Sequence, residues 1–269
     1  MKRLDGGRRA RRRPGAWLAR MALVAGWLAA LLAPRVAVAD VALVAVAANF
    51  AEVMERLEAD FERESPHAIT LTGGSTGKLY AQISGGAPYD VLLAADQERP
   101  ERLEAQGLAV RGTRFTYALG RLTLWSADPA LIGAHGAATL RAAGFRRLAI
   151  ANPDLAPYGM AARQTLERLE LYQTLRERIV LGENVGQAFA MVATGNAELG
   201  LIARSAVQSP RNGVRGSRWD VPEALYDPVR QDAVLLMRAE DNSAARDLLA
   251  YLRRPEVRAV IREYGYGTE

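Results

Sequence analysis

The 269-residue sequence contains no cysteine and only two histidines. Without cysteine, the chain cannot use disulfides, thiolate catalysis, iron–sulfur clusters or cysteine-based zinc sites. The two histidines, His67 and His135, lie in no H-x-x-H-like pattern, so each is predicted to be an ordinary surface or loop residue rather than a metal ligand. A chain without disulfides depends on its hydrophobic core, and the roughly 230 residues after position 39 are enough to build one.

An excess of positive charge is also missing from most of the chain. Nine lysines and arginines and one acid give residues 1–39 a net charge of +8, so the whole-chain charge of +5 leaves −3 for residues 40–269. The basic character of the sequence therefore belongs to its first segment. A net negative remainder gives no support to nucleic-acid binding, and we expect no nucleic-acid partner.

The first segment has the three-part layout of a secretory signal peptide. Residues 2–13 are strongly basic, residues 17–32 are mostly apolar, and Ala37-Val38-Ala39 fits a small-x-small cleavage site before Asp40. The apolar run is interrupted by Arg20 and is short for a membrane span. We therefore predict export with removal of residues 1–39, and a periplasmic protein without a lipid anchor, since no lipobox cysteine is present. The sequence leaves the Sec and Tat routes open.

The remaining sequence alternates short apolar runs with amphipathic segments, which indicates an α/β fold with largely parallel strands. We predict two α/β lobes, each a mainly parallel sheet flanked by helices. The first lobe is predicted to hold residues 40–120 and 228–269, and the second residues 121–227. The predicted strands are 41–47, 69–71, 91–94, 122–125, 148–151, 179–181, 199–202 and 233–237. Residues 211–220, rich in glycine and arginine, are predicted to be a surface loop.

Four predicted strand-to-helix turns carry small, amide or hydroxyl residues where a helix begins. They are Ala48-Asn49, Gly74-Ser75-Thr76-Gly77, Pro157-Tyr158-Gly159 and Asn184-Val185. A helix N-terminus presents unpaired N–H groups and the positive end of the helix dipole, so it suits an anion. In open α/β sheets, ligands bind beyond the carboxyl ends of the strands, where these turns lie. Any one such turn alone is explained by ordinary helix capping, and the Gly-rich turn lacks the spacing of a phosphate-binding loop.

Several segments together resemble the periplasmic molybdate-binding proteins of ABC transporters. They are "VAVAANF", "GGSTGKLYAQISGGAPYDVLLAADQ", "LAIANPDLAPYGMAARQTLERL", "ENVGQAFAMVATGNAELGLI" and "LLAYLRRPEVRAVIREYGYG", and they span nearly all of residues 40–269 in the family's order. The resemblance implies the type II periplasmic-binding-protein fold, capture of molybdate or tungstate between its two lobes, and delivery to a membrane permease. It implies a binding protein, not an enzyme, with no catalytic residues. It also implies no cofactor, and molybdenum only as the bound oxoanion with no direct protein ligands. We expect a monomer.

The resemblance also implies the residues of the binding site. Asn49 falls where the family has a Ser or Asn whose side chain and N–H meet the oxoanion, and Ala48 beside it is also predicted to bind the ligand. Ser75 and Thr76 lie at a Ser-rich turn, and the sequence does not decide between them. Tyr158 and Val185 match positions that contribute backbone N–H groups. One departure is Ala203, which stands where many members have a tyrosine hydroxyl. Either the anion has one donor fewer, or Tyr158 or Asn49 supplies the missing donor.

The chemistry of the turns agrees with this hypothesis. Molybdate at neutral pH has no proton to donate, so its site should contain donors and no carboxylate, and none of the four turns has an acid at its first helical positions; Asp154 and Glu183 are the nearest. Donors on both lobes favour a closed, ligand-bound form. Another oxoanion such as sulfate remains open. An exported hydrolase is the weaker alternative, because Ser75 lacks a G-x-S-x-G context and only two histidines are available. An adhesion or interaction module built on the 211–218 loop is another.

Overall fold

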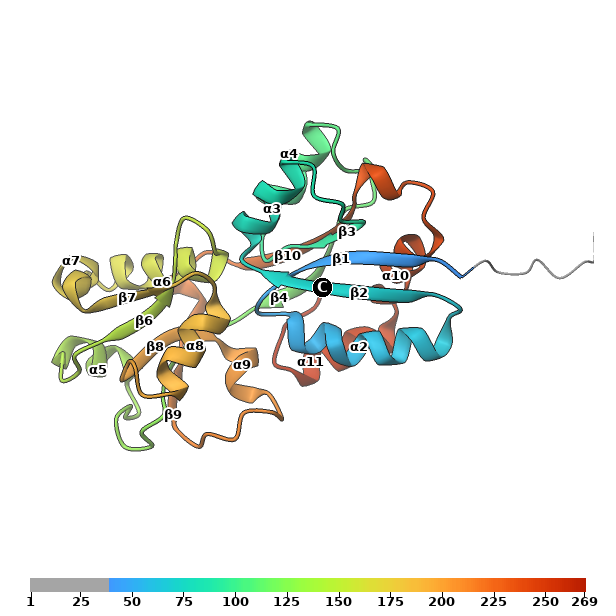
Figure 1. Ribbon diagram of the computed structural model, residues 1–269. Coiled ribbons are helices and arrows are strands. Elements are labelled where there is room, and N and C mark those ends of the chain that lie inside the picture. The colour runs from blue at the N-terminus through green and yellow to red at the C-terminus, as the bar shows by residue number, and fades with distance from the viewer. Residues whose placement is uncertain (1–38) are drawn as a thin grey trace, which may run out of the picture. The chain divides into compact units, whose positions relative to one another are not determined.

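Two five-stranded mixed sheets, each flanked by helices, form the part of the chain that the computed structural model describes, residues 39–269 (Figure 1). Residues 1–38 of the predicted signal peptide lie outside the described residues. None of the helices in residues 39–269 is long and apolar enough to cross a membrane. The predicted two-lobe α/β fold is confirmed.

The first sheet has the strand order β2-β1-β3-β10-β4. Its strands are β1 (Val41–Ala47), β2 (Ala68–Gly74), β3 (Val91–Leu93), β4 (Phe115–Gly120) and β10 (Val229–Leu235). Helices cover both faces: α2 (Ala51–Glu64), α10 (Ser243–Leu252) and α11 (Pro255–Glu263) one face, and α3 (Thr76–Ser84) and α4 (Glu98–Ala105) the other (Figure 1). The continuous apolar run of β1 follows from this, because a strand covered on both faces has no solvent side. Val44 and Val46 pack toward α2 and α10, whereas Ala45 packs toward α3.

The second sheet has the order β7-β6-β8-β5-β9. Its strands are β5 (Leu122–Ser126), β6 (Leu148–Ala151), β7 (Ile179–Gly182), β8 (Leu199–Ala203) and β9 (Ser217–Asp220). The helices of this lobe are α5 (Gly136–Ala142), α6 (Pro157–Arg168), α7 (Tyr172–Leu175), α8 (Val185–Ala193) and α9 (Arg204–Gln208). One hydrophobic cluster joins the sheet to α6 and α8.

Four of the five strands in each sheet run in the same direction, as predicted, and one runs against them. The reversed strands are β10 in the first sheet and β5 in the second, each of which pairs antiparallel with both neighbours. These are the two strands that follow a crossing between the sheets, because β5 follows β4 and β10 follows β9. The common direction places the carboxyl ends of β1, β2, β6 and β7 at the turns singled out in the sequence.

The predicted loop over 211–220 is wrong at its end, since Ser217–Asp220 forms β9 and pairs with β5. This four-residue edge strand is too short to show an alternating pattern, and the register with β5, not the local sequence, makes it a strand. His67 lies in the loop between α2 and β2, as predicted, although it is not at the surface. Its side chain is buried, its Nδ1 accepts the backbone N–H of Asp40 at 3.2 Å, and its Nε2 lies 3.3 Å from a carboxylate oxygen of Asp247.

Candidate functional site

The six residues singled out in the sequence line one small cavity between the two sheets. Its walls are Ala47, Ala48, Asn49, Gly74, Ser75, Thr76, Ala95, Ala156, Pro157, Tyr158, Asn184 and Val185. They come from the ends of β1 and β2, the end of β3, and the starts of α6 and α8. The cavity volume is about 10 Å³, far below the roughly 300–1,000 Å³ of pockets for organic ligands. A cavity of this size is too small for an organic ligand.

Backbone N–H groups without protein acceptors surround the cavity. Thr76 and Val185 are the first residues of α3 and α8, and Tyr158 is the second residue of α6; such N–H groups have no partner within their helix. Among the hydrogen bonds of residues 39–269, none is donated by the backbone N–H of Asn49, Ser75, Tyr158 or Val185. The N–H of Ala48 differs, since it donates to the carbonyl of Gly74 at 2.9 Å and extends the β1–β2 ladder. Ala48 is thus a wall of the cavity, with no donor to offer.

Ser75 and Thr76 differ in what their hydroxyls do. The Ser75 Oγ is the one buried side-chain polar atom in residues 39–269 that has no hydrogen-bond partner. The Thr76 Oγ1 accepts the backbone N–H of Ala95 at 2.9 Å and so ties α3 to the segment after β3. A buried hydroxyl without a partner costs about 1–3 kcal/mol. A group that completes the hydrogen bonds of Ser75 is therefore expected in this cavity.

The carboxamide of Asn49 is already engaged by protein. Its Nδ2 donates to the Oε1 of Gln231 at 2.8 Å and to the hydroxyl of Tyr266 at 3.1 Å. Its backbone carbonyl accepts the Tyr266 hydroxyl at 2.6 Å. Both amide hydrogens are used in this arrangement, so the N–H of the Asn49 backbone, and not the side chain, is the donor left for a ligand.

The side chain of Tyr158 lies in the crossing between the sheets. Its hydroxyl accepts from the Nε2 of Gln231 at 3.3 Å, and burial raises its pKa well above the ordinary value, so it stays neutral. A Cβ added to Gly120, where β4 ends, would lie 2.3 Å from this hydroxyl, so only glycine leaves room for it. The backbone N–H of Tyr158 lies in the first turn of α6 and has no acceptor within the fold, so it is a group that can serve a ligand in the cavity.

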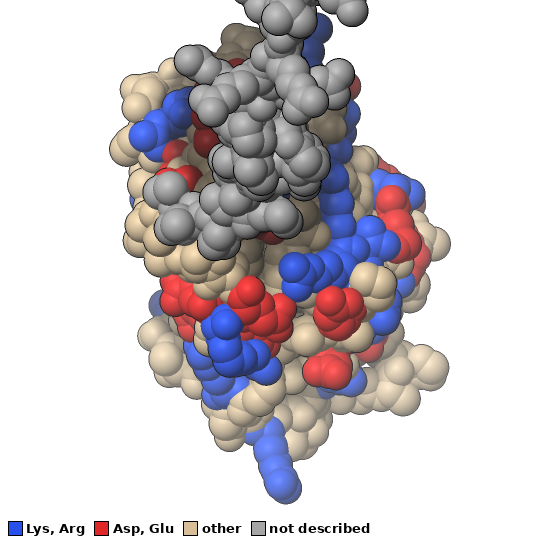
Figure 2. Space-filling model, turned by 90° about the vertical axis from the view of Figure 1, so that its right-hand side faces the viewer, with Lys and Arg blue, Asp and Glu red and all other residues tan. Residues whose placement is uncertain are grey.

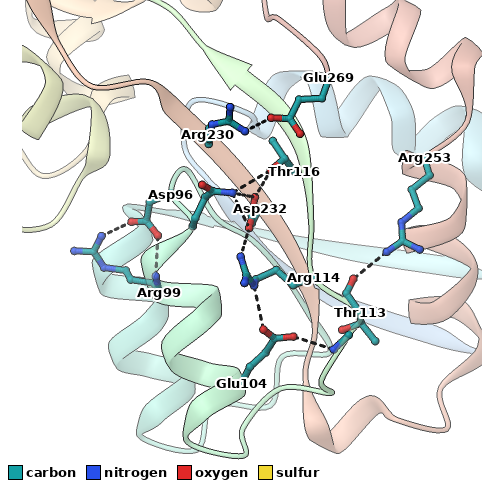
Figure 3. Close-up of polar contacts among 12 residues, drawn as sticks. Asp96, Arg99, Glu104, Thr113, Arg114, Thr116, Arg230, Asp232, Arg253 and Glu269 are labelled. Carbon is teal, nitrogen blue, oxygen red and sulfur yellow. Dashed lines mark hydrogen bonds and ion pairs between the residues drawn. The ribbon is translucent and has the colours of Figure 1, made fainter.

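No charged residue lines the cavity. Glu183 pairs instead with Lys78 of the other sheet's α3, with 2.8 Å between Nζ and Oε1, and Asp154 is exposed. Asp232, next to Gln231 on β10, is buried, but Figure 3 shows it surrounded by Arg114 and Thr116 at 2.9 and 2.7 Å. Its charge is therefore compensated within the first sheet. The cavity therefore offers neutral donors and no carboxylate.

Two larger hollows adjoin the cavity. One of about 210 Å³ shares Asn49 and Val185 with it and includes Ala203 at the end of β8. The other, of about 530 Å³, shares Ala95 and Pro157 and is lined by charges of both signs, including Asp96, Arg99 and Arg230. The small cavity, which brings together the unpaired backbone N–H groups and the Ser75 hydroxyl, is the candidate site.

The sequence pattern did not reveal three residues that support this site, Gln231, Tyr266 and Ser205. All three have buried polar side chains and come from segments far apart in the sequence, namely β10, the carboxyl-terminal tail and α9. Only the "YGYG" ending in the family-like segment pointed toward one of them.

Residues 42–267 match the family described as bacterial extracellular solute-binding protein. The chain is 46% identical over 252 residues to the molybdate-binding protein ModA of Azotobacter vinelandii, which covers 94% of this chain and 98% of that protein. It is 43% identical over 233 residues to ModA of Rhodobacter capsulatus, covering 87% of this chain and 90% of that protein. The solved periplasmic molybdate-binding protein of Azotobacter vinelandii superposes with a TM-score of 0.81 at 39% identity, over 85% of this chain and 99% of that chain.

Proposed function

The chain belongs to the bacterial extracellular solute-binding protein family, and from that premise we propose that it is the molybdate-binding component of an ABC transporter. The observation that carries the proposal is the cavity itself. Unpaired donors from both lobes converge there with no carboxylate among them, and one of them is the buried, unpartnered hydroxyl of Ser75.

The ligand set consists of neutral donors. It comprises the backbone N–H groups of Asn49, Ser75, Tyr158 and Val185 and the Oγ–H of Ser75, with Ala48 as a wall. Thr76 serves the fold through Ala95, so Ser75 supplies the hydroxyl. Hydrogen bonds to a charged group contribute about 1.5–3 kcal/mol each. Five of them, offset by desolvation of the anion, are sufficient for micromolar or tighter binding, which corresponds to about 8 kcal/mol.

A cavity with neutral donors and no carboxylate favours a fully deprotonated tetrahedral dianion. Monohydrogen phosphate carries a proton that needs an acceptor, and the lining offers no carboxylate to take it. Tungstate has nearly the same size and charge as molybdate and is expected to bind as well. Sulfate is smaller, so its contacts to the same donors are longer and its binding is weaker.

Local dipoles rather than a broad positive field attract the anion. On the face shown in Figure 2, basic and acidic side chains are intermixed, and residues 40–269 carry a net negative charge. The starts of α3, α6 and α8 each direct a positive dipole end toward the cavity.

Closure of two lobes completes the site, with residues 40–120 and 228–269 as one lobe and 121–227 as the other. Contacts across the cleft support this mechanism: the N–H of Gly77 donates to the carbonyl of Leu155 at 2.8 Å, and Arg211 pairs with Glu55 at 2.5 Å. An open form loses these contacts together with half of the donors. Ligand thus favours the closed form by differential affinity.

The cargo is delivered to a membrane permease from the periplasm, after export and removal of residues 1–39. The protein acts as a monomer and as a carrier, without turnover. The two ModA relatives are binding proteins, which supports this assignment.

Titration calorimetry with molybdate, tungstate, sulfate and phosphate tests the proposal. We expect molybdate and tungstate to bind at micromolar concentration or below, and sulfate and phosphate at least about tenfold more weakly, a difference of about 1.4 kcal/mol. Small-angle scattering should show a smaller radius of gyration with molybdate than without it. Equal affinity for sulfate would reassign the ligand, and binding without compaction would contradict closure.

The Lys78–Glu183 pair supplies a prediction of small effect. Its side chains are 52% and 37% exposed, and exposed ion pairs contribute about 1 kcal/mol at most. Lys78→Gln is therefore expected to weaken molybdate binding by no more than about fivefold, with the loss shrinking as salt is added. A much larger loss would mean that Lys78 itself meets the anion.

A further inference from the structure

The carboxyl-terminal tail, residues 264–267, contacts both lobes beside the anion cavity. Gly267 exchanges two backbone hydrogen bonds with Leu119, at 2.7 and 2.9 Å, and so fixes the tail along β4. From the second lobe, Arg204 donates to the carbonyl of Gly265, with its Nη2 at 2.7 Å. The tail is therefore fixed to the first lobe by backbone hydrogen bonds and contacted by the second lobe through Arg204.

Within the tail, the hydroxyl of Tyr266 joins three groups. It donates to the carbonyl of Asn49 at 2.6 Å, accepts from the Nδ2 of Asn49 at 3.1 Å, and accepts from the Oγ of Ser205 at 3.0 Å. Tyr266 is 4% exposed, and its ring packs edge-on against Phe50, with 5.5 Å between ring centroids. The hydroxyl is thus fixed in place and has all its hydrogen-bonding capacity in use.

Ser205 belongs to α9, which begins one residue after Ala203. The bond to Tyr266 is the one hydrogen bond of the Ser205 side chain within residues 39–269, and it crosses from the second lobe to the first. In this chain the segment that follows β8 therefore contacts the anion-binding turn indirectly, through Tyr266.

We propose that Tyr266 is a positioning residue for the oxoanion, which holds the Asn49 turn in its binding geometry and connects that turn to the second lobe through Ser205. The proposal rests on the proposed function. Tyr266 acts through Asn49, and it is not among the residues that line the cavity.

The physical reason lies in the peptide groups around Asn49. Its N–H points to the ligand only if the backbone torsions of Asn49 are fixed, and the Tyr266 hydroxyl restrains both the following carbonyl and the side chain of the same residue. Burial raises the pKa of Tyr266 to about 12, so the proton it donates to the carbonyl is retained at physiological pH. Without this donor the carbonyl of Asn49 loses a short hydrogen bond, and the turn can rotate its N–H away from the cavity.

Calorimetric titration of molybdate into purified Tyr266→Phe, Ser205→Ala and double-variant proteins tests the proposal. We expect Tyr266→Phe, which removes three hydrogen bonds, to raise the Kd about thirtyfold, and Ser205→Ala, which removes one of them, to raise it about fivefold. The double variant should match Tyr266→Phe alone, because Ser205 acts only through that hydroxyl. If Tyr266 had a purely structural role, Tyr266→Phe would lower the melting temperature. The effects of the two substitutions on the Kd would then not show this non-additivity.

Tyr251→Phe is the matched control. Tyr251 is also 4% exposed, but it lies on α10 and packs against Phe61, so its loss of a hydroxyl should leave the Kd unchanged. A Kd within twofold of wild type for Tyr266→Phe, or additive effects in the double variant, overturns the proposal. If Tyr266→Phe does not fold, Ser205→Ala becomes the test. The proposal is then overturned if Ser205→Ala has the same Kd as wild type and the same decrease in radius of gyration with molybdate. Failure of the wild-type protein to bind any oxoanion refutes the proposed function instead.

Discussion

Replacing Val185 with proline is expected to weaken molybdate binding about a hundredfold, or ~2.7 kcal/mol, without unfolding the protein. Val185 is the first residue of α8, and its N–H is one of the proposed donors to the anion. Proline removes that donor and leaves an anion oxygen without a partner. No side-chain substitution at this position tests the backbone group as directly.

The fold tolerates this substitution for two reasons. Proline is favoured at the first position of a helix, where the N–H has no intrahelical partner, and this chain already begins α6 with Pro157 and α11 with Pro255. The preceding residue, Asn184, has φ −142° and ψ 173°, the extended conformation that a residue before proline adopts. Its side chain can still cap the helix by accepting the N–H of Gln187 at 3.0 Å.

Val185→Ala is the control, since it keeps the N–H and removes only buried methyl groups. We expect its unfolding free energy to fall by about 1–2 kcal/mol while the Kd of molybdate changes by less than about threefold. Calorimetry for binding and urea unfolding for stability separate the two variants. If Val185→Pro remains folded and binds as tightly as wild type, the N–H of Val185 is not a ligand.

The second large effect is expected at Ser75, where alanine should weaken molybdate binding about thirtyfold. The unliganded protein should not lose stability, because the Ser75 Oγ is buried without a partner and its removal relieves a cost rather than breaking a bond. Thr76→Val should give the opposite result. It leaves the N–H of Ala95 without its acceptor, so the unfolding free energy should fall by about 1–3 kcal/mol with a smaller change in affinity.

The two variants are controls for each other, measured by calorimetry with molybdate and by urea unfolding without it. A binding defect in Thr76→Val and none in Ser75→Ala would reverse the assignment of the hydroxyl. A stability loss in Ser75→Ala would mean that its hydroxyl has a partner within the fold.

The sequence alone determines the local elements and the place of the site. The run over 41–47 forms β1 over the predicted residues, and Asn184, at a predicted strand-to-helix turn, caps α8. Such features depend on residues close together in the chain, so apolar periodicity and capping residues reveal them. Because strands of common direction end at one edge of a sheet, the turns at 49, 75, 158 and 185 could also be expected to meet there.

Only the tertiary structure decides which atoms at those turns remain available. The Thr76 hydroxyl is taken by Ala95, the carboxamide of Asn49 by Gln231 and Tyr266, and the N–H of Ala48 by Gly74. The strand β9 and the reversed direction of β10 likewise depend on neighbours far along the chain. A hydrogen bond between residues about 180 or more positions apart leaves no trace in local sequence, so the donors left over for a ligand are known only once the chain has folded.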